Sequence, residues 1–285
     1  MSAAVQQNSL PFAGLSNRGM RRLSELVREY SGICIGDDKH QLVANRLRRR
    51  VKELGIDSFD AYGDYVRSDA SGRELEMLVD LMSTNHTAFF REREHFTVLF
   101  NQLAPKLRAS LPAGVPLRVW SAAASSGEEP YTLALLAAEE QRRDSTLRWQ
   151  LQASDISRRM LEVANRGIYA LPSEAVVSTE LLRRYFERGV GPQDGRCRLR
   201  REVRDSVRFQ RINLLDARYP ILDRQHVIFC RNVMIYFDVP TRRVVVERLL
   251  SHLAPGGFLI VGYSESLGGL APGLVSVSHG VYTRL

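Results

Sequence analysis

Two adjacent carboxylates, Glu128 and Glu129, follow a run of small residues in the segment LRVWSAAASSGEEPY, which spans Leu117 to Tyr131. The segment begins with an apolar run typical of a buried parallel strand and ends in a helical pattern. This order lets a ligand lie against the backbone at the carboxyl end of a sheet. Acids at a helix start disfavour a phosphate and favour a ligand with cationic groups. The stretch alone is equally compatible with an ordinary strand–helix connection whose acids complement the helix dipole.

Acidic and amide side chains also end the later apolar runs. The residues at these ends are Asp155, Asn213, Leu214, Asn232 and Val233. An acid after the second strand is placed to accept hydrogen bonds from a ribose diol, although it can instead cap the next helix. The asparagines and their apolar neighbours can hold an adenine, although each asparagine alone is also a common turn residue and the valine a common core residue.

Several well-known sites are missing from the sequence. It contains no G-x-G-x-x-G, no G-x-x-x-x-G-K-[ST] and no G-x-S-x-G, and its six histidines do not cluster with acids at metal-ligand spacing. No metal is therefore expected. A nucleoside ligand that carries positive charge and no phosphate fits the pattern, and S-adenosylmethionine is such a ligand.

The elements that position these residues form an α/β domain over 116–285. Apolar runs alternate with helical patterns at 130–141, 156–166 and 240–253, which predicts a parallel sheet with helices on both faces. The last run, Val275–Tyr282, can add one antiparallel strand. An insertion at about 168–206 carries turn-forming glycines, and Arg196–Val203 alternates as short strands do, so a small antiparallel β-subdomain is expected there.

An all-helical domain is predicted at 16–85, after a loose leader of about 15 residues. Its helices are expected from Ser16 to Gly32, His40 to Leu54, Phe59 to Arg67 and Arg73 to Met82. A linker and connecting helix at 86–115 lead into the α/β domain.

Charge and composition indicate a cytoplasmic protein with an anionic partner. The net charge is +8 and the pI near 9.7. One helix carries a cluster of cations: Arg46, Arg48, Arg49, Arg50 and Lys52. Such a run is also typical of a solvated helix face. Three scattered cysteines indicate a reducing compartment, and neither a secretory signal nor an apolar run of about 18 residues is present, so no membrane insertion is expected.

Five motifs together resemble a known family. STNHTAFFRE, RVWSAAASSGEEPY, ASDIS, INLLD and CRNVMIYFD, in this order and spacing, are similar to the chemoreceptor glutamate methyltransferase family CheR over nearly the whole chain beyond the leader. The resemblance implies a Rossmann-like class I S-adenosylmethionine-dependent methyltransferase domain with a helical N-terminal domain closing over it. It also implies methylation of glutamate side chains on the cytoplasmic helices of methyl-accepting chemotaxis receptors.

The resemblance assigns roles to individual residues. The cofactor-binding positions it implies are Asn85, Thr87, Arg91, Glu129, Asp155, Asn213, Leu214, Asn232 and Val233. Arg91 and Tyr236 match the catalytic positions nearest the reacting methyl. The basic helix is implied to dock the acidic receptor helices, and the insertion to bind a C-terminal receptor peptide. The positions matching that tether are Arg188, Gly189, Gly191, Gly195 and Arg198.

The chemistry needs few groups. A free glutamate, with a pKa of about 4.3, is already ionised at neutral pH, so no general base is required. Arg91 can dock the carboxylate and Tyr236 can steer it by hydrogen bonding, in a site that excludes water. Alternatives are a methyltransferase of the same fold acting on RNA or another protein, and a non-catalytic S-adenosylmethionine-binding regulator. The basic helix has no interleaved aromatics for stacking bases, so no nucleic acid is expected, and a monomer suffices.

Overall fold

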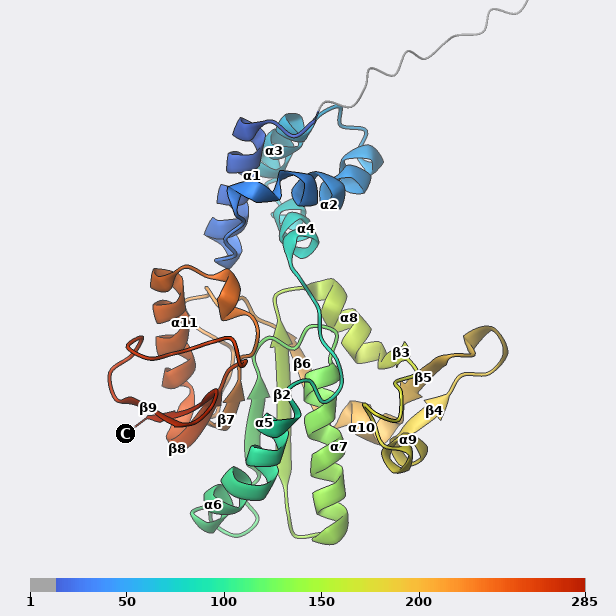
Figure 1. Cartoon of the computed structure of the whole chain (residues 1–285), viewed down its shortest axis with the longest axis vertical. Helices are drawn as coiled ribbons and strands as arrows, with labels where there is room; N and C mark the ends of the chain where they lie inside the picture. The colour runs from blue at the N-terminus through green and yellow to red at the C-terminus, as the bar shows by residue number, and fades with distance from the viewer. Residues whose placement is uncertain (1–13, 285) are drawn as a thin grey trace, which may run out of the picture. The chain divides into compact units, whose positions relative to one another are not determined.

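The computed structural model describes residues 14–284, so nearly all of the predicted leader lies outside the described residues. The chain divides into two compact units, the first ending at Ser83 and the second beginning at Thr84 (Figure 1). The segment 86–115, predicted as a linker and connecting helix, belongs to the second unit.

The first unit contains the four helices that the sequence predicts. They are α1 (Asn17–Ser31), α2 (His40–Glu53), α3 (Phe59–Ser68) and α4 (Arg73–Met82), with a short 3-10 turn, Asp37–Lys39, before α2. The Ser16 hydroxyl caps α1 by accepting a hydrogen bond from the Gly19 N–H at 2.9 Å. Apolar residues at helical spacing, including Met20, Leu47 and Leu78, are wholly buried and form the core of this unit.

A seven-stranded sheet organises the second unit, in the order β6-β2-β1-β7-β8-β10-β9. The strands are β1 (Leu117–Ser121), β2 (Trp149–Asp155), β6 (Val207–Arg211), β7 (Gln225–Phe229), β8 (Leu253–Ile260), β9 (Leu274–Ser278) and β10 (Val281–Arg284). The first five of these pair in parallel, as predicted, and β10 is antiparallel to both β8 and β9. The expectation of one strand over Val275–Tyr282 was wrong, because a turn at His279 and Gly280 divides the run into two strands.

Helices cover both faces of the sheet. They are α5 (Arg93–Val98), α6 (Ala104–Ala109), α7 (Glu128–Arg143), α8 (Arg158–Arg166) and α11 (Val239–Ser251). A π-helical turn at Leu99–Leu103 joins α5 to α6 immediately before Pro105, which has no N–H to continue a regular ladder. Val119 of β1 lies in the core cluster with α5–α7 residues, whereas Trp120 packs against Tyr219 and His252, as expected of successive strand residues that face opposite sides.

A three-stranded antiparallel sheet forms the predicted β-subdomain in the order β3-β5-β4. Its elements are β3 (Ile168–Ala170), α9 (Thr179–Tyr185), β4 (Phe186–Arg188), β5 (Arg196–Leu199) and α10 (Arg201–Asp205). The expected strand pattern over Arg196–Val203 holds only as far as Leu199, after which the chain turns into α10. Only glycine fits at position 189, since a Cβ there would lie 2.0 Å from the Gln193 carbonyl oxygen.

Candidate functional site

Glu129 stands at the start of α7, directly beyond the carboxyl end of β1. Its Oε1 accepts a hydrogen bond from the hydroxyl of Ser121, the last residue of β1, at 2.7 Å. Its Oε2 accepts from Arg231 Nη1 at 3.0 Å, and the Glu129 side chain is 11% exposed. The sequence therefore placed this carboxylate at the correct edge of the sheet, but it did not reveal the arginine that contacts it.

Arg231 connects this edge to the segment that precedes α5. It lies just beyond β7, and its side chain is 2% exposed. The second guanidinium nitrogen, Nη2, donates to the backbone carbonyl of Arg91 at 2.6 Å and to Glu92 Oε2 at 2.9 Å. The guanidinium also lies over the Phe96 ring, 5.4 Å from its centroid. An arginine directly after a buried apolar run was the available sequence signal, because burying a charge requires a partner.

Glu92 binds three donors from two other loops. Besides Arg231, its carboxylate accepts from Asn232 Nδ2 at 3.0 Å and from the Tyr263 N–H at 3.2 Å. The Glu92 backbone adopts a left-handed conformation with φ of 52°, which is unfavourable for a residue other than glycine. The contacts of its side chain hold the backbone in this conformation.

The buried charges in this cluster do not balance. Two carboxylates, Glu92 and Glu129, share one guanidinium. Burial raises the pKa of Glu92, but hydrogen bonds from Asn232 and Arg231 outweigh burial and hold that pKa below its usual value. Burial also raises the pKa of Glu129, and there the attraction of Arg231 and the Ser121 hydrogen bond do not compensate. Glu129 is thus short of positive charge, and a cationic ligand group would complement it.

Asp155, the last residue of β2, fixes two loops. Its Oδ2 accepts from the Ser125 N–H at 2.8 Å, and its Oδ1 accepts from the Ser157 N–H at 2.9 Å at the start of α8. The capping role offered as the alternative falls to Ser157 instead, whose hydroxyl accepts from the Met160 N–H at 3.0 Å. Binding to a ribose diol stays a prediction, to which a carboxylate can contribute through its further lone pairs.

Asn213 and Leu214 form a tight turn after β6. The Asn213 side chain accepts from the Leu215 N–H at 3.0 Å, and the Leu214 carbonyl accepts from the Tyr219 hydroxyl at 2.7 Å. Both residues are buried. The turn places them at the carboxyl end of β6, in the same sheet edge as Asp155.

Another buried carboxylate, Glu265, shapes the loop that carries Asn232 and Val233. It accepts hydrogen bonds from three backbone N–H groups, those of Asn232 at 2.7 Å, Met234 at 2.7 Å and Gly262 at 2.6 Å. A Cβ on Gly262 would lie 2.4 Å from Asn232 Nδ2, so glycine is needed for this approach. The sequence did not indicate Glu265.

The segment from Asn85 to Arg91 crosses the same edge of the sheet. The Asn85 carbonyl accepts from the Ser125 hydroxyl at 3.1 Å, and Arg91 Nη1 donates to the His86 carbonyl at 2.7 Å. Thr87 and Arg91 are half-buried. Asn85 and Arg91 thus lie with Glu129, Asp155 and Asn232 at one end of the sheet, as the resemblance implies.

Tyr236 ends a 3-10 turn, Met234–Tyr236, and is half-buried. Its N–H donates to the Val233 carbonyl at 3.1 Å. Within residues 14–284, no hydrogen bond joins its hydroxyl to Arg91. The structure therefore brings the predicted cofactor-binding residues to one end of the sheet, without showing a direct contact between the two predicted catalytic groups.

The predicted docking cations of α2 differ in exposure. Arg50 pairs with the buried Glu74, donating to Oε1 at 2.9 Å, and Arg46 donates to backbone carbonyls at the end of α4. Both therefore have structural partners elsewhere in the unit. Arg48, Arg49 and Lys52 are exposed, although Arg49 Nε also donates to Glu53 Oε1 of the same helix at 2.7 Å.

The predicted tether residues lie together on the β4–β5 hairpin of the subdomain. Arg188 ends β4, Arg198 lies in β5, and both side chains are exposed. Gly189, Gly191 and Gly195 belong to the connecting loop. In the part of the chain described, no three His, Cys, Asp or Glu side chains are grouped to hold a metal ion. No helix between residues 14 and 284 is long and apolar enough to cross a membrane.

Comparison with known proteins matches both units. Residues 18–83 match the family model for the CheR methyltransferase all-alpha domain, and residues 85–280 match that for the CheR methyltransferase SAM binding domain. The chain is 39% identical to a chemotaxis protein methyltransferase of Salmonella typhimurium, covering 90% of this chain and 86% of the relative. It is 40% identical to one from Escherichia coli, covering 88% and 85%. It is 39% identical to chemotaxis protein methyltransferase 2 of Pseudomonas aeruginosa, covering 92% and 91%.

Proposed function

This chain belongs to the CheR family of methyltransferases, and on that premise we propose that its Glu129-centred cluster holds S-adenosylmethionine for methylation of receptor glutamates. The protein is an S-adenosylmethionine-dependent protein-glutamate O-methyltransferase that acts on chemoreceptors. The observation that carries the proposed site is the charge of the buried cluster. Its two carboxylates and one guanidinium leave a negative charge for a cationic ligand group.

The cofactor positions follow from this cluster. Glu129 faces the ammonium, Asp155 the ribose hydroxyls, and Asn213, Leu214, Asn232 and Val233 the adenine. Asn85, Thr87 and Arg91 contribute from the segment that crosses the sheet edge. When bound, the cofactor supplies an electrophilic methyl group on a sulfonium.

The remaining work falls to the protein's own side chains. The acceptor carboxylate is already ionised at neutral pH, so no residue has to remove a proton from it. Arg91 has a guanidinium with five donors, of which one binds the His86 carbonyl, and it docks the acceptor carboxylate with the others. Tyr236 steers that carboxylate through its hydroxyl. The apolar neighbours of the cluster, Phe96 and Phe229, exclude water and so strengthen these interactions.

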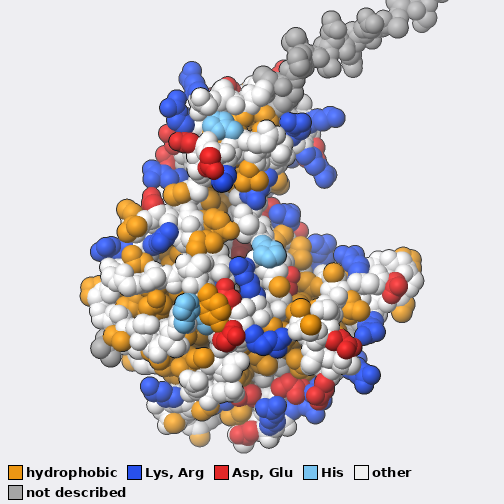
Figure 2. Space-filling view, in the orientation of Figure 1, with side chains coloured by type: hydrophobic (Ala, Val, Ile, Leu, Met, Phe, Trp, Pro, Cys, Tyr) orange, Lys and Arg blue, Asp and Glu red, His pale blue; other side chains and the backbone are white. Residues whose placement is uncertain are grey.

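Methyl transfer is tested with radiolabelled S-adenosylmethionine, offered separately to receptor-containing membranes and to RNA. Base-labile label on the receptor is expected, with little on RNA. Figure 2 supports this choice, because on the face shown Lys and Arg side chains are interspersed with acidic ones and do not form a single basic stripe.

The role of Arg91 is tested by Arg91→Ala, for which transfer should fall by about 100-fold. Arg93→Ala, a nearby arginine whose side chain donates to the Val176 carbonyl, is the control and should stay close to wild type. Label found only on RNA, or an Arg91→Ala variant as active as the control, contradicts the proposal.

A tether to the receptor's C-terminal peptide is proposed for the β-subdomain. The exposed Arg188 and Arg198 on adjacent strands can pair with the peptide carboxylates, which raises the local concentration of receptor. Removing the C-terminal peptide from the receptor should raise the KM of the enzyme for the receptor and leave kcat unchanged. A KM that is the same for both receptor forms argues against the tether.

The protein is further proposed to act in the cytoplasm, because its receptor substrates present their methylated helices there, and as a monomer, because the proposed mechanism needs only the residues of one sheet edge. Sedimentation at micromolar concentration should give a mass near 32.3 kDa. A stable dimer would contradict this.

A further inference from the structure

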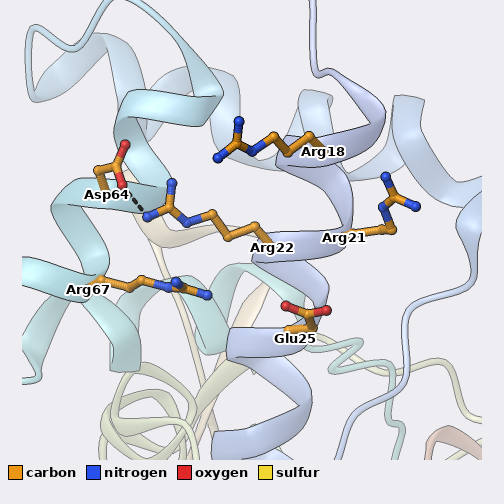
Figure 3. A pocket seen from close by; sticks show the side chains of 6 residues that line it. All are labelled: Arg18, Arg21, Arg22, Glu25, Asp64 and Arg67. Atoms are coloured by element: carbon orange, nitrogen blue, oxygen red, sulfur yellow. Dashed lines mark hydrogen bonds and ion pairs between the residues drawn. The ribbon is translucent and has the colours of Figure 1, made fainter.

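A charged hollow of about 450 Å³ lies between α1 and α3 of the first unit (Figure 3). Every side chain that lines it is ionisable: Arg18, Arg21, Arg22, Glu25, Asp64 and Arg67. Four cations therefore face two anions. Neither the cofactor site nor the basic helix α2 contributes to this hollow.

The arginines converge from two helices. Figure 3 shows Arg18, Arg22 and Arg67 pointing into the space between α1 and α3, with Arg22 paired to Asp64. Arg22 is half-buried, and its Nε has no hydrogen-bond partner among the described residues. The Arg22 hydrogen bond lowers the pKa of Asp64, and the charges of Arg67 and Arg18 lower it further, so all three guanidinium groups act on one carboxylate.

The positive end of the α1 dipole disfavours a cluster of arginines at the start of this helix. Arg18, Arg21 and Arg22 lie in the first two turns of α1, where the helix dipole favours anions, and the first turn contains no acid. Ser16 and Asp60 already occupy the end of the helix, through the Ser16 cap and its bond to Asp60. The clustering does not reflect a basic unit, since residues 14–83 contain twelve Lys or Arg and twelve Asp or Glu. Such a local conflict is typical of a binding site.

The lining limits the class of ligand. Guanidinium groups bind carboxylates and phosphates, but no aromatic or aliphatic side chain is present to receive a base or an acyl chain. The hollow is open, because five of its six residues are exposed. Arg18 and Arg22 are four residues apart, about 6 Å along α1. Carboxylates three or four residues apart on a partner helix have the same spacing.

We propose that this hollow docks an acidic helical segment of a protein partner. The proposal rests on the proposed function in one respect: the acidic cytoplasmic helices of the chemoreceptor are the partner. The hollow is then a second docking point on the first unit, separate from the exposed α2 cations Arg48, Arg49 and Lys52.

The test is a binding measurement on the full chain with a receptor cytoplasmic fragment, by calorimetry at about 50 and about 200 mM salt. The triple variant Arg18→Gln/Arg21→Gln/Arg67→Gln removes three exposed cations and keeps the Arg22–Asp64 pair. The matched control, Arg142→Gln/Arg143→Gln/Arg208→Gln, removes three exposed cations from the second unit.

The triple variant should bind the receptor about tenfold more weakly at the lower salt concentration and show a smaller salt dependence. Its affinity for S-adenosylhomocysteine and its kcat at saturating receptor should equal those of the wild type, and the control should match the wild type throughout.

Equal receptor affinity for the two triple variants overturns the docking proposal, even if the wild type methylates receptors. A second outcome also overturns the docking proposal. If the wild type binds inorganic tripolyphosphate tightly, and only the Arg18/Arg21/Arg67 variant loses this binding while its receptor affinity is unchanged, the hollow is assigned to a phosphorylated ligand. If receptor binding depends on the hollow but the protein transfers no methyl group to the receptor, the docking proposal stands and the proposed function is refuted instead.

Discussion

Replacing Glu92 with glutamine tests the charge balance of the buried cluster. The substitution keeps the size of the side chain and removes one negative charge. The carboxylate now accepts from Arg231, Asn232 and the Tyr263 N–H, and His95 Nδ1 lies 3.5 Å from its Oε2. A glutamine must turn its own NH₂ group toward at least one of them, and that hydrogen bond is lost.

The expected cost in stability is moderate. Hydrogen bonds to a charged group contribute about 1.5–3 kcal/mol each. Arg231 keeps its contacts with Glu129 and with the Arg91 carbonyl, so the guanidinium does not become an unpaired buried charge. We expect the free energy of unfolding of the second unit to fall by about 2–3 kcal/mol.

The effect on cofactor affinity follows from the same charge count. With Glu92 neutral, Glu129 only balances Arg231, and no negative charge remains for the ligand ammonium. Coulomb's law with an effective dielectric constant of about 20 gives about 2 kcal/mol for a charge roughly 8 Å away. The affinity for S-adenosylhomocysteine should therefore fall roughly 30-fold.

Titration calorimetry with two ligands separates this electrostatic effect from simple damage to the site. S-adenosylhomocysteine carries the ammonium, whereas 5′-methylthioadenosine lacks it and should bind the variant almost as it binds the wild type. Glu94→Gln is the matched control, because Glu94 is exposed and bonds the Tyr263 hydroxyl. An affinity for S-adenosylhomocysteine within twofold of the wild type, or an equal loss for both ligands, refutes the reasoning.

Three further changes test other parts of the structure. Burial lowers the pKa of His95 to about 4, below its unfolded value of 6.5, so protonation favours unfolding. The free energy of unfolding, highest above about pH 6.5, should therefore fall by about 2 kcal/mol between pH 7 and pH 5. Chemical denaturation of the His95→Gln variant should not show this loss. Gly262→Ala should weaken S-adenosylhomocysteine binding about tenfold by displacing Asn232, whereas Gly268→Ala, whose nearest neighbour would be 3.8 Å away, should leave calorimetric affinity unchanged. Glu74→Gln removes the buried charge that Arg50 and Tyr62 contact. Urea denaturation should show the first unit destabilised by about 3 kcal/mol, with the cofactor affinity unchanged. A variant as stable as the wild type would show that this ion pair contributes little.

The sequence predicted the helices and strands that are specified by local patterns, such as capping residues and hydrophobic periodicity. Ser16 is the N-cap of α1, and the predicted range Arg73–Met82 is that of α4. Glu129 and Asp155 could be assigned to one edge because the carboxyl ends of parallel strands meet there. That inference requires only the alternation of strands and helices, which periodicity reveals.

The residues that the sequence did not reveal act through distant partners. Arg231 is 102 positions from Glu129 and 139 from Glu92, so no local spacing indicates either contact. Asp155 shows the opposite problem, because a capping acid and a ribose-binding acid occupy the same position. The division of Val275–Tyr282 into two strands was missed because the run is apolar on both sides of a two-residue turn.

Glu265 has a consequence for how this enzyme can change over evolution. Its carboxylate holds the loop from Asn232 to Met234 through backbone N–H groups, which every amino acid except proline supplies. Beyond Asn232, whose left-handed backbone (φ of 57°) suits few residue types, the path of the loop therefore depends little on the side chains along it. The exposed Ile235, which follows in the same turn, can vary, and with it the shape presented to different receptors, while the backbone of the site is inherited unchanged.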